Sequence, residues 1–466
     1  MSFLNRASEL ALLRERAASA EAEFLVVYGR RRVGKTELLT QLARDCRSVY
    51  FEATPSTAIG QLRGLSEQLA RATGDRGYAR RPLIDWGQAL DAIADFARDE
   101  PSLVVLDEFQ FLARQHQGME GQINVWWRET GRHLPITLVV AGSEVSFFED
   151  EVLAGTMYGR RTGQLKVLPF LAKDAALFHP GYTPEDRIRA FAVCGGIPYY
   201  LERFDDSRPL RTHLLQEIIS PTGILHSEAE LLLRQSITSP ENHFAVLGAI
   251  AHGYNRNSTI ADRTGLAPAQ VLKTLRVLER LGLVEQLRPM TAPARSKKTA
   301  YRIADQFLRF HCRFIESDRS LTRTAELAES YLAGSVLPKF DHFVSEAWEE
   351  VCQEYVLLNA PEVAKVGRWW GNVPTGRERR VEMREIDVVG IDHDQRATAI
   401  GMCKWTSTEV DFDELNLLDR LIPHIERTVE HPMRYLFSRS GFSERLQRHA
   451  VDDPYLTLIE PIDIYR

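Results

Sequence analysis

The sequence of 466 residues has no charge-free run of about 18 apolar residues, the length that a membrane-spanning helix needs. Its N-terminal stretch MSFLNRASELALLRERAASA lacks the apolar core of a secretion signal. The net charge of −6 argues against a uniformly basic surface, so any contact with DNA must use a local basic patch. The cysteines form no C-x-x-C pair, which argues against structural zinc and disulfides and predicts a cytoplasmic protein; they are Cys46, Cys194, Cys312, Cys352 and Cys403.

The length and composition are typical of a soluble protein with several domains. The hydrophobic content is 44% and the charged content is 26%, as in ordinary globular proteins. A chain of 466 residues is too long for one hydrophobic core, so we expect about three domains.

A strand–loop–helix pattern near the N-terminus predicts a phosphate-binding site. The apolar run 24–28 predicts a buried parallel strand, and a helical pattern covers residues 37–45. Between them GRRRVGKT has the Walker A spacing, in which backbone N–H groups and a helix dipole hold phosphates. Lys35 is expected to reach the β- and γ-phosphates, and the Thr36 hydroxyl to hold Mg²⁺. The predicted nucleotide-binding residues are Gly29, Arg30, Arg31, Arg32, Val33, Gly34, Lys35, Thr36 and Glu37.

Two later apolar runs end in polar residues that suit ATP hydrolysis. PSLVVLDEFQ has the Walker B pattern, with Asp107 expected to bind Mg²⁺ and Glu108 to orient and deprotonate the attacking water. The strand TLVVAGS ends at Ser143, which is placed to sense the γ-phosphate. With the run SVYFEA at residues 48–53, there are four apolar strands that alternate with helical stretches, which predicts a parallel sheet with helices on both faces. The nucleotide is expected at the carboxyl ends of those strands.

Two further segments contain candidate site residues. In MYGRRTGQL, Arg160 or Arg161 is a candidate arginine finger that acts in cis or from a neighbouring subunit. The alternative is a pair of surface arginines that bind a carboxylate. In CGGIPYYLERF, Pro198 is placed either to pack against the adenine or simply to begin a helix.

These motifs, with F-x-N-R-x-x-E-L at residues 3–10, VAGSEVSFFE and GGIPYYL, resemble the archaeal-type ATPase family of archaea and bacteria. That family belongs to the AAA+-like STAND branch of P-loop ATPases, and the resemblance runs through nearly the whole chain. It implies ATP binding, slow hydrolysis and a switch controlled by the nucleotide.

The middle of the chain predicts a winged helix. HFAVLGAIAHG, STIADRTG and LAPAQVLKTLRVLERLGLV are successive helical patterns, and EQLRPM and KTAYRI are extended runs around a turn. The alternative to DNA contact is a lid or packing module whose charges are solvated. The basic residues of the third helix and of the wing are expected to contact DNA phosphates; they are Lys273, Arg276, Arg280, Arg295, Lys297 and Lys298.

The order of helix, three strands, helix and strand after residue 336 is that of the PD-(D/E)xK nuclease core. The C-terminal domain of the archaeal-type ATPase family is similar to this fold, with the usual pattern E-I-D-V-V followed by G-E-C-K-W. The resemblance assigns Asp387 as the strand carboxylate that holds a metal, and Lys404 as the lysine that stabilises charge at the phosphate. It assigns the helix carboxylate to Glu349, with Glu350 as a rival.

Met402 stands where the family usually has Glu. A thioether does not replace a carboxylate as a ligand of Mg²⁺, because hard cations need oxygen. Glu385, two residues before Asp387, is a candidate substitute on the same strand face. We therefore expect this domain to bind DNA or to pack rather than to cleave, and Met402→Glu to restore cleavage if the rest of the site is retained.

The expected fold class is α/β. It combines a P-loop parallel-sheet ATPase domain at residues 1–168, a helical lid at 169–235, a winged-helix domain at 236–315, a helical connector at 316–335 and a restriction-endonuclease-like α/β domain at 336–466. The expected function is that of a nucleotide-switched ATPase that binds ATP, Mg²⁺ and DNA. Two alternatives stay open. One is an ATP-gated metal-dependent nuclease. The other is a STAND-like scaffold or antitoxin-like protein that forms a homo-oligomer or binds another protein. No membrane association is expected.

Overall fold

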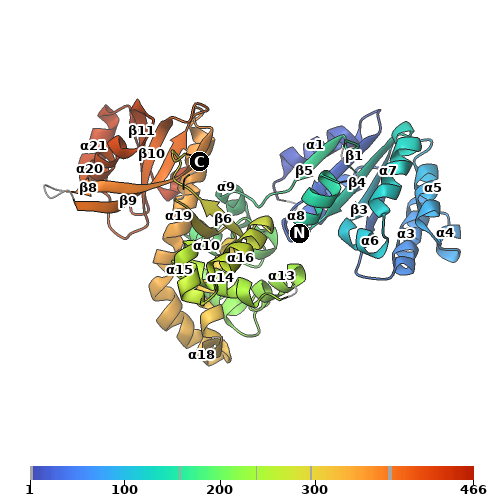
Figure 1. Cartoon of the computed structure of the whole chain (residues 1–466), viewed down its shortest axis with the longest axis horizontal. Helices are drawn as coiled ribbons and strands as arrows, with labels where there is room; N and C mark the ends of the chain where they lie inside the picture. The colour runs from blue at the N-terminus through green and yellow to red at the C-terminus, as the bar shows by residue number, and fades with distance from the viewer. Residues whose placement is uncertain are drawn as a thin grey trace. The chain divides into compact units, whose positions relative to one another are not determined.

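The computed structural model describes residues 4–155, 157, 159–237, 239–293, 296, 298–375 and 380–466. The chain divides into two compact units, Met1–Pro169 and Phe170–Arg466 (Figure 1). Within the described residues, no helix combines the length and the apolar character needed to cross a membrane.

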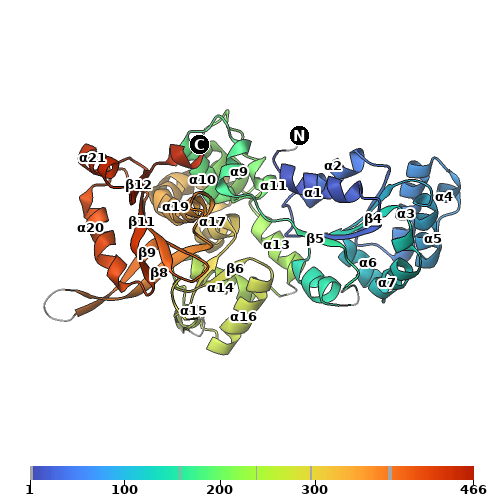
Figure 2. The same ribbon diagram turned by 90° about the horizontal axis from the view of Figure 1, so that it is seen from above.

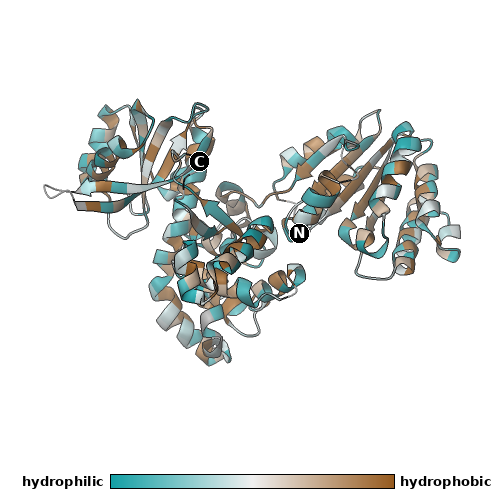
Figure 3. Ribbon diagram, in the orientation of Figure 1, coloured by the Kyte–Doolittle hydropathy of each residue, from teal (hydrophilic) through white to brown (hydrophobic). Residues whose placement is uncertain are grey.

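The first unit contains a five-stranded sheet in which all neighbouring strands are parallel, in the order β2-β3-β4-β1-β5. The three inner strands are buried along their whole length and are largely hydrophobic (Figure 3). The predicted parallel sheet is thus confirmed. Its strands are β1 (Glu23–Tyr28), β2 (Ser48–Glu52), β3 (Ser102–Asp107), β4 (Ile136–Gly142) and β5 (Gly163–Lys166).

Helices cover both faces of this sheet. Helices α1 (Ala7–Ala17) and α2 (Lys35–Arg44) lie on one side, and α6 (Phe109–Gln115) and α7 (Met119–Glu129) lie on the other (Figure 2). Their apolar faces pack against the strands to form the core. The shorter or more peripheral helices are α3 (Ala58–Thr73), α4 (Gly77–Arg80), α5 (Trp86–Phe96), η1 (Gly131–His133), α8 (Val145–Phe147) and η2 (Phe148–Leu153).

The second unit begins with a helical region. Helix α10 (Pro184–Cys194) packs against α17 (Gln306–Phe314) and the long α19 (Leu337–Asn359). The remaining helices of this region are α9 (Ala172–Ala175), η3 (Ala176–Phe178), α11 (Pro198–Leu201), α12 (Leu210–His213), η4 (Leu214–Ile219), α13 (Glu228–Ser236), η5 (Glu316–Thr322), α18 (Ala325–Tyr331) and η6 (Leu332–Val336).

A helix-turn-helix follows α13 in the chain, as predicted. It consists of α14 (Glu241–Ala251), α15 (Asn257–Thr264) and α16 (Pro268–Arg280), which contact one another. Helix α15 is followed directly by Gly265, whose φ of 71° is the left-handed conformation that glycine adopts without strain. Two antiparallel strands, β6 (Val284–Leu287) and β7 (Ala300–Ile303), complete the module.

The C-terminal part of the second unit is a mixed five-stranded sheet in the order β12-β11-β10-β9-β8. Neighbours among β8, β9 and β10 are antiparallel, whereas β10, β11 and β12 are parallel. Helix α19 covers one face, and α20 (Phe412–Leu421) and α21 (Glu444–Asp452) cover the other (Figure 1). The remaining elements are β8 (Lys365–Thr375), β9 (Arg380–Ile391), β10 (Ala397–Lys404), η7 (Ile422–His424), β11 (Thr428–Ser438), β12 (Leu456–Ile459) and α22 (Pro461–Ile464).

Candidate functional site

The predicted phosphate loop joins β1 to α2 at the carboxyl edge of the parallel sheet, because β1 ends at Tyr28 and α2 begins at Lys35. Gly34 has a φ of 90°, a conformation that costs glycine little. At Gly29, an added Cβ would lie 2.3 Å from the carbonyl oxygen of Val167, so only glycine lets the loop pass so close to the segment after β5. Both glycines of the motif therefore have a structural reason to be there.

Lys35 lies inside this loop and is only 4% exposed. Its Nζ donates to the carbonyl oxygens of Gly29 and Arg30, each at 3.0 Å. Burial lowers the pKa of Lys35 to about 8, although the Glu108 and Asp107 carboxylates oppose this effect. Neutral carbonyl groups are weaker partners for an ammonium group than phosphate oxygens. The loop therefore fits a phosphate group, which would replace these partners.

The Asp107 carboxylate is fully buried at the end of β3. Its Oδ2 accepts hydrogen bonds from the Thr36 hydroxyl at 3.0 Å and the Tyr50 hydroxyl at 2.6 Å, and its Oδ1 accepts from the Glu108 amide at 2.8 Å. Hydroxyl and carboxylate oxygens are the ligands that Mg²⁺ prefers. The structure thus brings together Thr36 and Asp107, the two residues predicted to hold that ion beside the nucleotide.

Tyr50 was not among the predicted residues. It lies on β2, which pairs in parallel with β3, so that strand pairing brings its hydroxyl to Asp107. The strand SVYFEA was recognised in the sequence, but the sequence does not say which strand lies beside it. Burial, together with Asp107 and Glu108, also raises the pKa of Glu52 at the end of β2.

Glu108 begins the segment after β3 with a φ of 51°, which is uncommon for a residue other than glycine. Its Oε2 accepts a hydrogen bond from the Ser143 hydroxyl at 2.8 Å and another from the Gln110 side-chain amide. Ser143 follows β4, the neighbour of β3, so both predicted residues meet at one edge of the sheet. Gln110 was not predicted from the sequence.

Arg6 connects the N-terminal motif to the phosphate loop. This residue is 5% exposed, and its Nη2 donates to the carbonyl oxygens of Val33 at 2.9 Å and Leu168 at 2.6 Å. Its Nη1 donates to Glu9 at 2.8 Å. Arg6 and Glu9 are the R and E of the F-x-N-R-x-x-E-L motif, which the structure explains as an anchor for the loop backbone.

Arg160 and Arg161 lie away from the phosphate loop. Strand β5 runs parallel to β1 in the register Leu25–Gly163, so residues that precede β5 lie toward the start of β1, whereas the loop follows its end. Arg160 donates to Asn124 at 3.0 Å and Arg161 to the carbonyl of Leu153 at 3.2 Å. This geometry does not support an arginine finger in cis, and a finger from a neighbouring subunit stays a prediction.

Pro198 begins α11 in the second unit. The preceding Gly196 packs so closely that an added Cβ would lie 1.8 Å from the carbonyl oxygen of Phe170. Pro198 therefore has the helix-start position that was one of its two expected roles, and its packing against adenine stays a prediction.

Around Asp387 the C-terminal sheet contains a β-bulge. The register shifts between the pairs Gly367–Val389 and Trp369–Ile386, so one residue of β8, Arg368, faces two residues of β9. The Asp387 Oδ2 accepts from the Cys403 amide at 2.8 Å. Burial raises the pKa of Asp387, although the Cys403 amide and Arg368 oppose this effect.

Of the two candidate helix carboxylates, Glu349 is the one that interacts with Asp387. It makes an ion pair with Arg368, with 2.6 Å between Oε2 and Nη2. Burial raises the pKa of Glu349 to about 8; Arg368 opposes this shift and Asp387 reinforces it. Glu350 instead bonds to Arg309 at 2.6 Å and Arg302 at 3.1 Å.

Met402 and Lys404 contact residues of α20, although the Lys404 charge also acts to lower the pKa of Asp387. Met402 is 6% exposed within an apolar cluster that includes Leu415 and Leu418, and the Lys404 Nζ lies 3.1 Å from Glu414. A Glu at position 402 would begin in that apolar cluster and not beside Glu349. The restoration of cleavage by Met402→Glu stays a prediction. Among the described residues, no group of three or more His, Cys, Asp or Glu side chains could hold a metal ion.

The predicted DNA-contacting residues of α16 are exposed, while its apolar residues Val271, Leu275 and Leu278 are buried. Lys298 is also exposed. Arg295 and Lys297 lie outside the described residues. The exposed cations on α16 are Lys273, Arg276 and Arg280.

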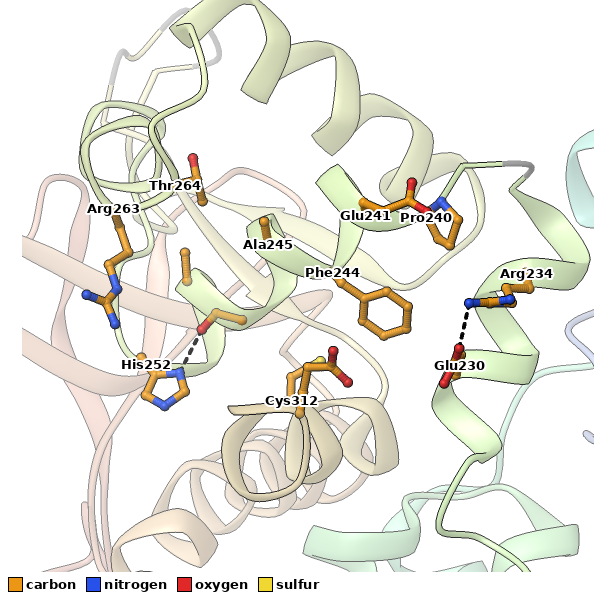
Figure 4. A pocket seen from close by; sticks show the side chains of 13 residues that line it. Glu230, Arg234, Pro240, Glu241, Phe244, Ala245, His252, Arg263, Thr264 and Cys312 are labelled. Atoms are coloured by element: carbon orange, nitrogen blue, oxygen red, sulfur yellow. Dashed lines mark hydrogen bonds and ion pairs between the residues drawn. The ribbon is translucent and has the colours of Figure 1, made fainter. Parts of the chain in front are cut away.

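A cavity of about 690 Å³ lies among α13, α14 and α17 (Figure 4). Its lining includes Phe244, Cys312 and the ion pair of Glu230 with Arg234, at 2.7 Å. None of the residues predicted from the sequence lines this cavity, so it is separate from the candidate sites.

Comparison with known protein families identifies the first part of the chain. Residues 3–204 match the model of an ATPase domain predominantly from Archaea. The chain carries an archaeal-type P-loop ATPase domain. Residues 239–288 match the IclR helix-turn-helix domain, and residues 311–415 match a family described as "Archaea bacterial proteins of unknown function". The archaeal ATPase prediction is thereby confirmed for this domain, whereas the nuclease-like assignment stays a prediction.

Several individual proteins are also similar. An uncharacterized protein of Methanocaldococcus jannaschii is 27% identical over 415 residues, which cover 86% of this chain and 87% of the relative. The Walker-type ATPase of Pyrococcus abyssi has 20% identity and a TM-score of 0.49, covering 67% of this chain and 96% of its own. The ORC2 protein of Aeropyrum pernix, in ADPNP–ADP complexes, has 16% identity and a TM-score of 0.43, covering 72% and 96%.

Proposed function

We propose that this protein is an ATP-dependent DNA-binding protein in which the nucleotide at the P-loop controls DNA binding by the helix-turn-helix. One observation carries the proposal. The side chains of Lys35, Asp107 and Glu108 gather at the carboxyl ends of the parallel strands β1 and β3, each held by groups that a ligand can replace. The match to a helix-turn-helix domain supports DNA as the controlled partner.

The P-loop residues have distinct proposed roles. Lys35 binds the β- and γ-phosphates, aided by backbone N–H groups of residues 29–37, while Thr36 and Asp107 hold Mg²⁺. When bound, Mg²⁺ neutralises charge on the phosphates. Glu108 orients the attacking water and accepts its proton, and Ser143 keeps the Glu108 carboxylate in place through its 2.8 Å hydrogen bond.

The DNA surface is proposed to include the exposed cations of α16 and Lys298. Because the apolar residues of α16 are buried against its neighbours, the opposite face is available to a major groove. Binding through such phosphate contacts weakens as the salt concentration rises. The slope of log K against log salt concentration, the salt slope, grows by about 0.9 for each contact with duplex DNA.

We propose that the C-terminal sheet contributes to binding and does not cleave DNA. Glu349 already has Arg368 as a cationic partner, and Met402 occupies an apolar cluster with residues of α20. The carboxylates therefore do not form the set of oxygen ligands that Mg²⁺ requires.

The proposal is tested by measuring duplex DNA affinity with ATP, with ADP and without nucleotide, for the wild type and for Lys35→Ala. We expect the wild-type affinity to differ at least about fivefold between nucleotide states, a coupling of about 1 kcal/mol, and the variant to show no response. Equal wild-type affinities in all three states, or an unchanged response in Lys35→Ala, would refute nucleotide control.

The DNA surface is tested with the double variant Lys273→Gln/Arg276→Gln. We expect it to weaken duplex binding and to lower the salt slope by about 1.8 for two lost contacts. Arg420→Gln/Arg448→Gln, which removes two exposed charges from α20 and α21, is the matched control. Equal loss in both variants would mean that overall charge, not the surface of α16, determines binding.

A further inference from the structure

Tyr50 lies outside the predicted motifs, yet its hydroxyl reaches the carboxylate of Asp107. It is on β2, the edge strand of the parallel sheet, whose register places Glu52 directly beside Asp107. Successive side chains of a strand point to opposite faces, so Tyr50, two residues before Glu52, shares a face with Asp107. A long aromatic side chain can span the distance to such a diagonal neighbour on the adjacent strand.

The hydroxyl of Tyr50 shares one carboxylate oxygen with the hydroxyl of Thr36. The Asp107 Oδ2 accepts from Tyr50 at 2.6 Å and from Thr36 at 3.0 Å. The other oxygen, Oδ1, accepts from the Glu108 amide at 2.8 Å. Because both oxygens are held, the carboxylate is restrained against rotation about its Cβ–Cγ bond, and Oδ2 stays directed toward Thr36.

The direction of this carboxylate matters because Asp107 is fully buried, whereas Thr36 is exposed. A buried carboxylate takes part in a site that opens to solvent only if one of its oxygens points toward the opening. The hydrogen bond from Tyr50 comes from the edge strand, and Thr36 belongs to the phosphate loop. The two hydroxyls therefore hold the same oxygen from different elements of the fold.

The packing of β2 does not depend on the Tyr50 hydroxyl. Val49 and Phe51 bury their side chains in the core on the opposite face, and β2 pairs with β3 along its whole length. Tyr50→Phe removes the hydroxyl and keeps the aromatic ring. This substitution therefore separates the hydrogen bond to Asp107 from the packing of the strand.

We propose that Tyr50 is a positioning residue for the Mg²⁺ that accompanies the nucleotide, because its hydroxyl holds the Asp107 Oδ2 toward Thr36. Groups that hydrogen-bond to a metal-binding carboxylate orient it, and their loss weakens metal binding about 10- to 100-fold. Tyr50 acts through Asp107 and is assigned no contact with the nucleotide. The inference rests on the proposed ATP and Mg²⁺ site and adds a residue of the edge strand to it.

The test measures nucleotide binding without hydrolysis. The full chain is titrated calorimetrically with the non-hydrolysable analogue ADPNP, in EDTA and at a series of Mg²⁺ concentrations. For Tyr50→Phe we expect the Mg²⁺ concentration that gives half of the gain in ADPNP affinity to rise about tenfold. The affinity in EDTA should match that of the wild type, because Lys35 and the loop backbone are intact.

Tyr78→Phe is the matched control, because it removes a tyrosine hydroxyl from α4 in the same unit. It should show the wild-type response to Mg²⁺. Thermal unfolding without nucleotide verifies that each variant is folded.

A double-mutant cycle with Asp107→Asn tests whether Tyr50 acts through Asp107. Effects of independent residues add, whereas the effects of two residues in one hydrogen-bonded network do not. In the Asp107→Asn background, Tyr50→Phe should therefore raise the required Mg²⁺ concentration by less than about twofold. A purely structural role of the Tyr50 hydroxyl would not depend on the carboxylate in this way.

Three results would overturn the inference. One is a wild-type Mg²⁺ requirement in Tyr50→Phe. Another is an equal loss of ADPNP affinity with Mg²⁺ and in EDTA, which would mean that Tyr50 supports the site as a whole. The third is full additivity with Asp107→Asn. ADPNP binding by the wild type that does not respond to Mg²⁺ would refute the proposed Mg²⁺ site as well, and no ADPNP binding would refute the proposed nucleotide function.

Discussion

The P-loop site and the region around Asp387 both contain carboxylates, but they differ in the partners of those carboxylates. Asp107 accepts hydrogen bonds from two hydroxyls and a backbone amide, all of them neutral. Glu349 is instead ion-paired with Arg368. A neutral donor is replaced by a metal ion more readily than an arginine already bound to the carboxylate. Similar residue types therefore have neutral partners in one region and a cationic partner in the other, and the proposed metal site is the one with neutral partners.

The lysines of the two regions show the same contrast. Lys35 is buried and donates to two carbonyl groups, so its charge is not neutralised by a direct ion pair. Lys404 forms a 3.1 Å ion pair with Glu414 of α20. An anionic ligand gains more from the first lysine, because it does not compete with a carboxylate.

The largest expected effect comes from Met402→Glu. The new carboxylate would lie among Leu415 and Leu418, and an unpaired buried charge lowers the free energy of unfolding by about 3 kcal/mol or more. Burial would raise the pKa of this Glu above its unfolded value of about 4.3. The loss of stability relative to wild type should thus be small below pH 4 and grow as the pH rises.

Thermal unfolding of Met402→Glu at several pH values measures this loss. Met402→Leu, which keeps the volume nearly constant, is the control and should cost less than about 1.5 kcal/mol. A Glu variant that is as stable as the Leu variant at pH 8 and cleaves DNA with Mg²⁺ would show that the region around Asp387 also holds a metal ion. That result would contradict the proposed difference between this region and the P-loop site.

The second effect is on nucleotide binding by Lys35→Ala. Removing the buried ammonium should weaken ATP binding about 100-fold, or about 2.7 kcal/mol, as expected for the loss of a charge-assisted contact. Isothermal titration measures the affinity. Lys166→Ala, which removes a surface lysine paired with Glu149 in the same unit, should bind ATP like the wild type. Equal losses in the two variants would contradict a specific role for Lys35.

The difference between the two regions also explains which features the sequence predicts. The P-loop is local: a strand, a six-residue turn and a helix follow one another, so spacing alone brings Lys35 to the loop carbonyls. Asp107 and Ser143 were predictable because each ends an apolar strand. In a parallel sheet such ends gather at one edge.

Features that depend on strand order were not predictable. Tyr50 reaches Asp107 only because β2 lies beside β3, and Arg368 reaches Glu349 only because a bulge lies opposite it in β9. A shift of one residue turns side chains to the other face, and no local pattern in the sequence encodes that shift. The side of the sheet taken by Met402 was likewise visible only in the structure.

A third prediction concerns the pH dependence of ATP binding. Since burial lowers the pKa of Lys35 to about 8, the unliganded site loses its positive charge as the pH rises through that value. Only the charged form attracts phosphate, so ATP affinity should fall about tenfold between pH 7 and pH 9. In Lys35→Arg the guanidinium stays charged, and this decline should disappear. A decline of equal size in Lys35→Arg would assign the titration to another group.

The smallest expected effect comes from Ser143→Ala, which tests whether the neutral donors around Glu108 matter for hydrolysis. The variant lacks the 2.8 Å hydrogen bond to Glu108, worth about 1 kcal/mol, so kcat should fall about fivefold. ATP affinity should hardly change, because Lys35 and the loop backbone are intact. A steady-state assay separates the two quantities, with Ser143→Thr as the variant that keeps a hydroxyl. A drop in affinity with kcat unchanged would instead place Ser143 among the groups that bind the nucleotide.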